Sequence, residues 1–327
     1  FSIILLIDIF DVNLKKSLTN FLSFNTSETL KQSVKILILY IILTFGIFVI
    51  LNILNIRSFN SFNLAMTLIS SGGFMPTNNL NNIINTNLQE IIFSFLMLIS
   101  FFSIMLSYNL FFFKKKNIIF FQEDFYLLIY FLILTSLFFV FFNNNNNFSE
   151  IFLALCSTIS NIGISSVKYN QNLSFIFLIL ALIGGSLFST SSGIRFIKLY
   201  SIFKFSINEL ASHAHPKNIY ITKLKFSDSV LNIDDINKIF ISILIFVISL
   251  FLLVSLLTLA GIDIEISFKL AILTITNTVN SSIYGLEDFN FDDLHYFTKY
   301  FLISFMIIGR VELLTFLIII KKFLFKN

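Results

Sequence analysis

Three clusters of small and polar residues stand out in a chain that is otherwise strongly apolar. They are SSGGF at 70–74, SNIGI at 160–164 and TNTVNSS at 276–282. Glycine tolerates backbone conformations with φ > 0, which allows a loop to present several carbonyl oxygens on one side. A ring of backbone carbonyls can replace the water shell of a dehydrated cation. The clusters therefore indicate coordination of a cation by main-chain oxygens.

Each cluster ends an apolar stretch that is too short to cross a membrane, at 60–74, 150–164 and 266–282. A short helix whose C-terminal end lies at such a cluster adds about half a negative charge to the site. Non-helical backbone is tolerated inside a membrane only where protein or a water-filled path surrounds it. We therefore predict three segments that enter the membrane, turn and leave on the same side, around a pore.

The elements that position these segments are membrane-spanning helices. The 327-residue chain has 56% hydrophobic and 12% charged residues and a mean hydropathy of +0.89, which is far more apolar than a soluble domain. Several windows reach the roughly 20 residues needed to cross a bilayer. The predicted spans are 36–55, 90–113, 125–142, 173–200, 238–260 and 297–320. Because the chain starts with Phe1, we interpret residues 1–7 as the end of a helix that begins upstream.

Positive charges lie on one side of these spans, and that side is cytoplasmic by the positive-inside rule. They are Lys15, Lys16, Lys114, Lys115, Lys116, the stretch from Lys198 to Lys225, Lys321, Lys322 and Lys326. The opposite loops carry little positive charge, and one of them holds Glu287, Asp288, Asp292 and Asp293. The formal net charge of +4 is therefore a signal of topology. The expected partner is the lipid bilayer, and no nucleic acid is expected.

Two charged residues, Arg310 and Glu312, lie in the middle of the last predicted span. A charge near the bilayer centre costs roughly 2.5–3.5 kcal/mol, so it normally faces a partner or a wet cavity. Glu312 cannot pair with Arg310 on one helix, because positions i and i+2 do not face each other. An arginine that snorkels to the interface is the alternative, but Lys321 lies eleven residues, or roughly 16 Å, further along the helix. We therefore place Arg310 in a pore.

Together with two further motifs, the clusters resemble the successive signatures of the TrkH family, within the Trk/Ktr/HKT superfamily of cation transporters. The further motifs are IGGSLFSTSSGIRFIKL at 183–199 and IIGRVELLTFLIII at 307–320. The resemblance implies an all-α membrane protein of repeated helix, re-entrant pore helix and helix units around a pseudo-fourfold pore. It divides the chain into the tail of a first repeat with a cytoplasmic linker (1–32), pore repeat 2 (33–124), pore repeat 3 with a gate loop (125–236) and pore repeat 4 (237–327). Because the filter of the first repeat is lacking, we expect an N-terminally truncated fragment.

By this resemblance, backbone groups of the three clusters form a selectivity filter that binds potassium. The filter residues are Ser70, Ser71, Gly72, Gly73, Ser160, Asn161, Ile162, Gly163, Asn277, Thr278, Val279 and Asn280. Gly72 and Gly163 are expected at the narrowest point. In the last cluster Asn280 takes the place of the family's glycine, and asparagine tolerates left-handed backbone better than most residues do. Glycines that serve only helix packing or turns are the alternative.

The middle of the predicted span 173–200 matches the family's gate, a loop of small residues just below the filter. The matching residues are Gly184, Gly185, Ser186, Ser189, Thr190, Ser191, Ser192 and Gly193. Leu187 and Phe188 are bulkier than the family's residues. Arg310 would project into the pore close to this loop, where its charge raises a barrier to cations and helps to hold the gate shut. A continuous helix packed through its small residues is the alternative.

The resemblance implies potassium uptake through a gated pore in the bacterial cytoplasmic (inner) membrane, and no enzymatic activity. No covalently bound cofactor is expected, and the potassium ion itself is the ligand of the filter. The family forms homodimers that bind a cytoplasmic nucleotide-binding regulator, TrkA. The basic cytoplasmic loop at 209–224 is the candidate contact with such a TrkA-like subunit.

Other chemistry is disfavoured by the same residues. A proton-translocating subunit of a respiratory complex has a similar composition, but it needs lysines and glutamates midway along several helices, and apart from Arg310 and Glu312 the span centres are bare. A membrane-embedded enzyme needs a nucleophile with a base or a pair of ligands, which no span contains. His213 and His215 resemble part of a metal site, yet no cysteine or carboxylate cluster completes one. The single cysteine, Cys156, excludes an intrachain disulfide and is interpreted as a packing residue.

Overall fold

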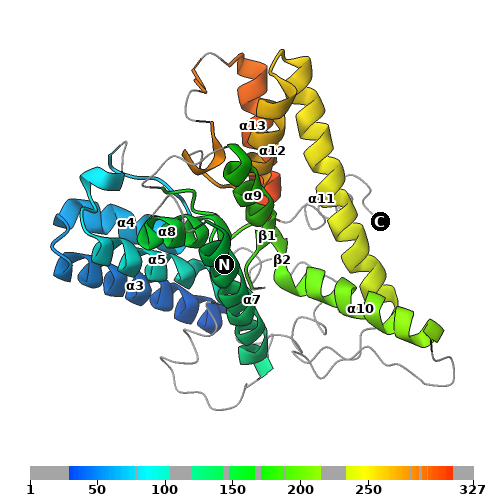
Figure 1. Ribbon diagram of the computed structural model, residues 1–327, viewed down its shortest axis with the longest axis horizontal. Coiled ribbons are helices and arrows are strands. Elements are labelled where there is room, and N and C mark those ends of the chain that lie inside the picture. Colours follow the sequence, from blue (N-terminus) through cyan, green and yellow to red (C-terminus); the bar gives the residue numbers. More distant parts are fainter. Residues whose placement is uncertain are drawn as a thin grey trace.

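The structure is a computed structural model that describes most of the chain from residue 29 onwards. The described residues are 29–77, 80–103, 119–142, 147–165, 171–186, 189–214, 233–279, 282–286, 289–292 and 294–311. Within them the regular structure is helical, apart from two strands of two residues each (Figure 1). The predicted all-α fold class is confirmed.

A long helix, a short helix and a further helix follow one another three times along the chain. The first unit is α3 (Thr29–Ile53), α4 (Ser58–Ser70) and α5 (Asn87–Phe101); the second is α7 (Ile119–Phe142), α8 (Phe148–Ile159) and α9 (Gln171–Leu182); the third is α11 (Ile233–Leu259), α12 (Ile264–Ile275) and α13 (Tyr296–Val311). The remaining elements are η2 (Leu80–Asn82), β1 (Ile183–Gly184), β2 (Ile194–Arg195), α10 (Phe196–Ala214) and η3 (Ser282–Tyr284). The short helices α4, α8 and α12 correspond to the three predicted half-length segments.

Local sequence signals explain where α5 begins and how its first turn is held. The α5 helix begins with a capping box, in which the Thr86 hydroxyl accepts from the backbone N–H of Gln89 and the Gln89 side chain accepts from the N–H of Thr86. The Gln89 amide also donates to the carbonyl of Leu54, at 2.8 Å. This bond holds the start of α5 against the end of α3. The short helix α4 packs against both α3 and α5.

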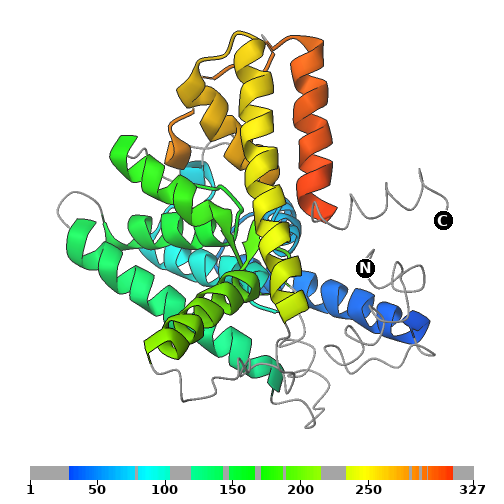
Figure 2. The same ribbon diagram turned by 90° about the vertical axis from the view of Figure 1, so that its right-hand side faces the viewer.

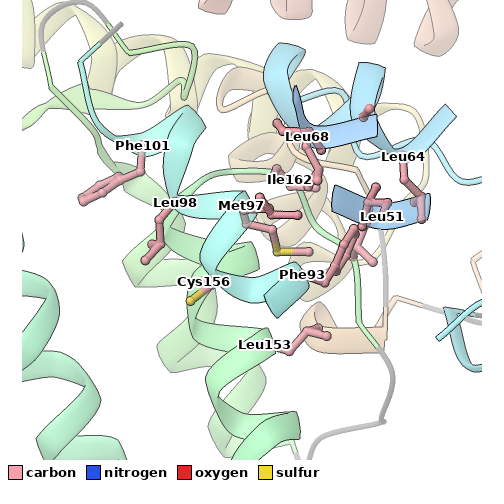
Figure 3. Packing of buried hydrophobic residues seen from close by; sticks show 14 of the residues in the cluster. Leu51, Leu64, Leu68, Phe93, Met97, Leu98, Phe101, Leu153, Cys156 and Ile162 are labelled. Carbon is pink, nitrogen blue, oxygen red and sulfur yellow. The ribbon is translucent and has the colours of Figure 1, made fainter. Parts of the chain in front are cut away.

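Two clusters of buried apolar side chains hold the units together, and α8 contributes to both. Leu153 and Cys156 pack with α4 and α5, whereas Ala154 and Leu155 pack with α9, α11 and α12. Figure 3 shows the first cluster, in which Ile162 from the turn after α8 lies among the side chains of α4 and α5. A helix that is buried all round is fixed on every face. The second half-length segment is therefore central, and Cys156 packs in the core as predicted.

Two helices of the described residues are long and apolar enough to cross a membrane, at Glu123–Val140 and Ile236–Leu259. They match the predicted spans 125–142 and 238–260. In Figure 2 the second of them, α11, runs beside α13, which it contacts. The prediction of a span over 90–113 is wrong as a continuous helix, because α5 already ends at Phe101. The predicted span 173–200 is interrupted where its small residues begin, since α9 ends at Leu182 and α10 begins at Phe196. The ends of α5 and α9 both lie at one loop, the one that connects α9 to α10.

Candidate functional site

The three short helices end in the same backbone turn. The corner residues are Ser71, Asn161 and Asn277, with left-handed φ angles of 50°, 57° and 50°. In each case the backbone N–H of the following residue donates to the carbonyl five residues earlier, at 2.9 Å. This pattern is the one that terminates a helix at a left-handed residue. We name the segments that follow the first loop (71–74), the second loop (161–164) and the third loop (277–279).

The common corner fixes which residues are equivalent in the three loops. Gly73 and Gly163 stand two positions after their corners, and both have positive φ, of 70° and 81°. We predicted Gly72 as the counterpart of Gly163, but the structure gives this position to Gly73, one residue later. The sequence SSGGF contains two adjacent glycines, and only the corner at Ser71 decides between them. In the third loop the equivalent position is Val279, and not Asn280, which lies outside the described residues.

The three loops meet at these positions. A Cβ atom added to Gly73 would lie 2.0 Å from the carbonyl oxygen of Ile162 and 2.6 Å from a methyl carbon of Val279. A Cβ atom added to Gly163 would lie 2.3 Å from the carbonyl oxygen of Val279. Such contacts are far shorter than a carbon atom tolerates, so only glycine fits at both places. The main chains of three separate segments thus approach one another at one point, where the second and third loops each place a carbonyl oxygen.

The chain between α9 and α10 forms a loop of residues 183–195 instead of a continuous helix. Its two ends pair as the parallel strands β1 and β2, with Ile183 opposite Ile194 (Figure 1). The predicted gate residues all lie in it. Gly184, Gly185, Ser186, Ser189, Ser191 and Ser192 are buried, and Thr190 and Gly193 are half-buried. The alternative of an unbroken helix packed through small residues is therefore wrong.

This α9–α10 loop is hydrogen-bonded to the end of α5. The N–H of Ser186 donates to the carbonyl of Phe101, and the N–H groups of Thr190 and Ser191 donate to the carbonyl of Ser100, at 3.1, 3.1 and 3.2 Å. The last carbonyls of a helix have no partner inside it. Because α5 stops where the chain turns extended at Phe102, with ψ of 165°, these carbonyls are free for the loop.

An arginine that the motif analysis did not single out holds the loop from within. One terminal nitrogen of Arg195 donates to the carbonyls of Ser186, Ser189 and Ser191, and to the Ser189 hydroxyl, at 2.9–3.3 Å. These four acceptors lie on both arms of the loop. A sequence signal existed, since Arg195 lies two residues after Gly193 in an otherwise apolar predicted span, where a charge needs partners.

Arg310 holds the same loop from α13. Its guanidinium donates to the carbonyl of Thr190, to the hydroxyl of Ser192 and to the carbonyl of Ser70, each at 3.1 Å. Gly309 allows this approach, because a Cβ atom there would lie 2.2 Å from the carbonyl oxygen of Ile275 at the end of α12. Arg310 thus lies at the α9–α10 loop and the end of α4, rather than snorkelling toward an interface. Glu312 lies outside the described residues.

The remaining candidate was the histidine pair His213 and His215. His213 lies in the last turn of α10, and His215 falls outside the described residues. Across the part of the chain that the structure describes, no group of three or more His, Cys, Asp or Glu residues could hold a metal ion. The described geometry therefore offers main-chain oxygens and hydroxyls, together with two arginines, as the polar groups of the site.

Comparisons with known proteins show which fold this geometry belongs to. No protein-family model matches the sequence, and no curated protein sequence matches it. Among solved structures, the chain is similar to the crystal structure of the potassium transporter TrkH from Vibrio parahaemolyticus, with a TM-score of 0.79. The chain has the TrkH fold. The match covers 97% of this chain and 69% of that TrkH chain, at 18% sequence identity. At this identity the likeness to TrkH is one of fold, and it agrees with the architecture that the sequence motifs predict.

Proposed function

We propose that the chain carries potassium ions across a membrane through a path bounded by the first, second and third loops, with the α9–α10 loop as its gate. The observation that carries the proposal is the meeting of three main-chain turns at Gly73, Gly163 and Val279. The TrkH fold supports it, because the similar protein is a potassium transporter. A single ion gains about 2.3 kcal/mol per 100 mV when it moves down the membrane potential.

Electrostatics favour a cation at the loops and a barrier beyond them. Each short helix directs the negative end of its dipole, about half a charge, at the meeting point. Arg310 donates to the carbonyl of Ser70, the last residue of α4, so it neutralises part of that dipole. Arg195 adds a second positive charge at the α9–α10 loop. An ion that leaves the filter on this side meets two fixed like charges while the loop is in place.

Location and partners are part of the same proposal. The chain acts in the bacterial cytoplasmic membrane as a homodimer, and a TrkA-like nucleotide-binding subunit contacts the basic segment 209–224. The resemblance of the sequence motifs supports these partners. A proton-translocating respiratory subunit is not favoured, because the centres of α7 and α11 carry no Asp, Glu, His or Lys with which to relay protons.

The test is growth of a potassium-uptake-deficient bacterium at low potassium, with the full-length gene supplied. The wild-type gene is expected to restore growth, and Gly163→Asp to abolish it, because the side chain has no room at 2.3 Å from the Val279 oxygen. Gly261→Asp is the matched control, since Gly261 also has a positive φ, of 89°, but no atom within 4 Å of an added Cβ. Growth with Gly163→Asp equal to wild type, with both proteins present in the membrane, would overturn the proposal.

A further inference from the structure

We infer that Val279 makes the third loop the one that limits both the rate and the selectivity of cation passage. This inference rests on the proposed function and concerns the same site. It starts from a departure from symmetry: after three equivalent corners, Gly73 and Gly163 adopt positive φ, whereas Val279 does not. A β-branched side chain is strongly disfavoured at positive φ, so the third loop cannot follow the course of the other two.

The first consequence is that the carbonyls at the two contacts come from different positions of their loops. At Gly73 the neighbouring oxygen belongs to Ile162, the residue before the glycine of the second loop. At Gly163 the neighbouring oxygen belongs to Val279 itself, one position later, and Thr278 contributes a methyl carbon, 3.1 Å from an added Cβ. The carbonyls of the third loop are thus one residue out of step with those of the second. A ring of oxygens built from these loops is uneven at this level.

The second consequence is steric. The Cβ and one methyl carbon of Val279 lie 2.8 and 2.6 Å from the position of a Cβ on Gly73, so the isopropyl group fills the space that Gly73 leaves open. Methyl groups supply no oxygen to a dehydrated cation. The third loop therefore places apolar atoms at the point where the first and second loops place glycines, and an ion is compensated less well there for its lost water.

The third loop is also fixed in this position. The side-chain amide of Asn277 donates to the carbonyl of Met306 on α13, at 3.0 Å, and Gly309 on the same helix contacts the end of α12. The corner residue Asn277 is thus bonded to α13 only two residues before Val279. An ion cannot easily push Val279 aside without disturbing α13.

Two substitutions separate the backbone effect from the steric one. Val279→Ala removes two methyl groups but keeps the preference for negative φ, whereas Val279→Gly removes the side chain and also permits positive φ. The full chain is reconstituted in proteoliposomes, and potassium and sodium uptake are measured separately with ion-sensitive dyes. Val247→Ala is the matched control, because Val247 is exposed on the outer face of α11.

We expect Val279→Ala to speed the uptake of both ions without changing their ratio. Val279→Gly is expected to speed uptake and to raise the ratio of potassium to sodium about tenfold, which corresponds to roughly 1.4 kcal/mol of discrimination. Wild-type rates and ratio in both variants, in a chain that transports potassium, would overturn the inference while leaving the proposed function standing. Absence of cation uptake by the wild-type chain would instead overturn the proposed function, and this inference with it.

Discussion

The hydroxyl of Ser71 lies 3.1 Å from the hydroxyl of Thr190, so a hydrogen bond joins the first loop to the α9–α10 loop. Ser71 is the left-handed corner at the end of α4, and Thr190 also receives a bond from Arg310 through its carbonyl. The candidate filter and the candidate gate are thus in direct contact. Any movement of the α9–α10 loop away from the filter breaks this bond.

The first prediction concerns that bond. Ser71→Ala and Thr190→Val each remove it, and a hydrogen bond of this kind contributes about 1 kcal/mol, so the closed state should lose roughly fivefold in population. Potassium leak from proteoliposomes measures the change. Thr190→Val also removes the bond from the Thr190 hydroxyl to the carbonyl of Ser100, at 3.3 Å. The double variant should therefore leak no more than Thr190→Val alone, because that variant has already lost the bond to Ser71. Effects that add in the double variant would show that the two residues act separately.

A matched control for these variants is Ser255→Ala. The Ser255 hydroxyl bonds only to the carbonyl of Leu252 in its own helix, at 2.7 Å, and it is exposed. Its loss should leave the leak unchanged. An equal leak in Ser255→Ala would attribute the effect of Ser71→Ala to general loosening of the protein.

The second prediction concerns Arg310. Arg310→Ala removes a fixed positive charge and three hydrogen bonds to the α9–α10 loop and α4, and leak conductance should rise about tenfold or more, since a barrier lowered by about 1.4 kcal/mol gives tenfold. Arg310→Lys keeps the charge, but one ammonium group cannot reach all three acceptors, and it should fall between wild type and Arg310→Ala. Planar bilayer recordings measure both. Wild-type conductance in Arg310→Ala would mean that the arginine is no barrier.

The third prediction concerns Arg195. Arg195→Met removes the four bonds that hold the arms of the α9–α10 loop together, and amide hydrogen exchange at Thr190 and Ser191 should quicken about tenfold or more. Because one nitrogen makes all four bonds, Arg195→Lys should restore most of the protection. Arg57→Met, which removes an exposed arginine at the start of α4, is the control. Exchange that is the same in Arg195→Met and wild type would contradict a positioning role.

Much of the architecture could be predicted from the sequence because half-length apolar segments that end in small polar residues have few stable solutions in a membrane. The three short helices begin within two residues of the predicted 60, 150 and 266, at Ser58, Phe148 and Ile264. The break in the predicted span 173–200 also followed from its small residues. These features are local, so the composition of each segment determines them.

What the sequence could not supply depends on contacts between distant segments. The early end of α5 at Phe101 reflects carbonyls that bond to Thr190 and Ser191, about ninety residues later in the chain. The equivalence of Gly73 with Gly163 depends on the corner at Ser71, which two adjacent glycines conceal. Arg195 forms its bonds only after the loop has closed on it, so its role depends on the fold and not on its motif.

The most direct test of the account compares Gly73→Ala with Gly46→Ala in potassium uptake by proteoliposomes under an inside-negative potential. A Cβ atom on Gly73 collides with the Ile162 oxygen at 2.0 Å, whereas one on Gly46 meets no atom within 4 Å. The account predicts uptake at the wild-type rate with Gly46→Ala and near-complete loss with Gly73→Ala, with both proteins folded. Wild-type uptake by Gly73→Ala would show that potassium does not pass where the three loops meet.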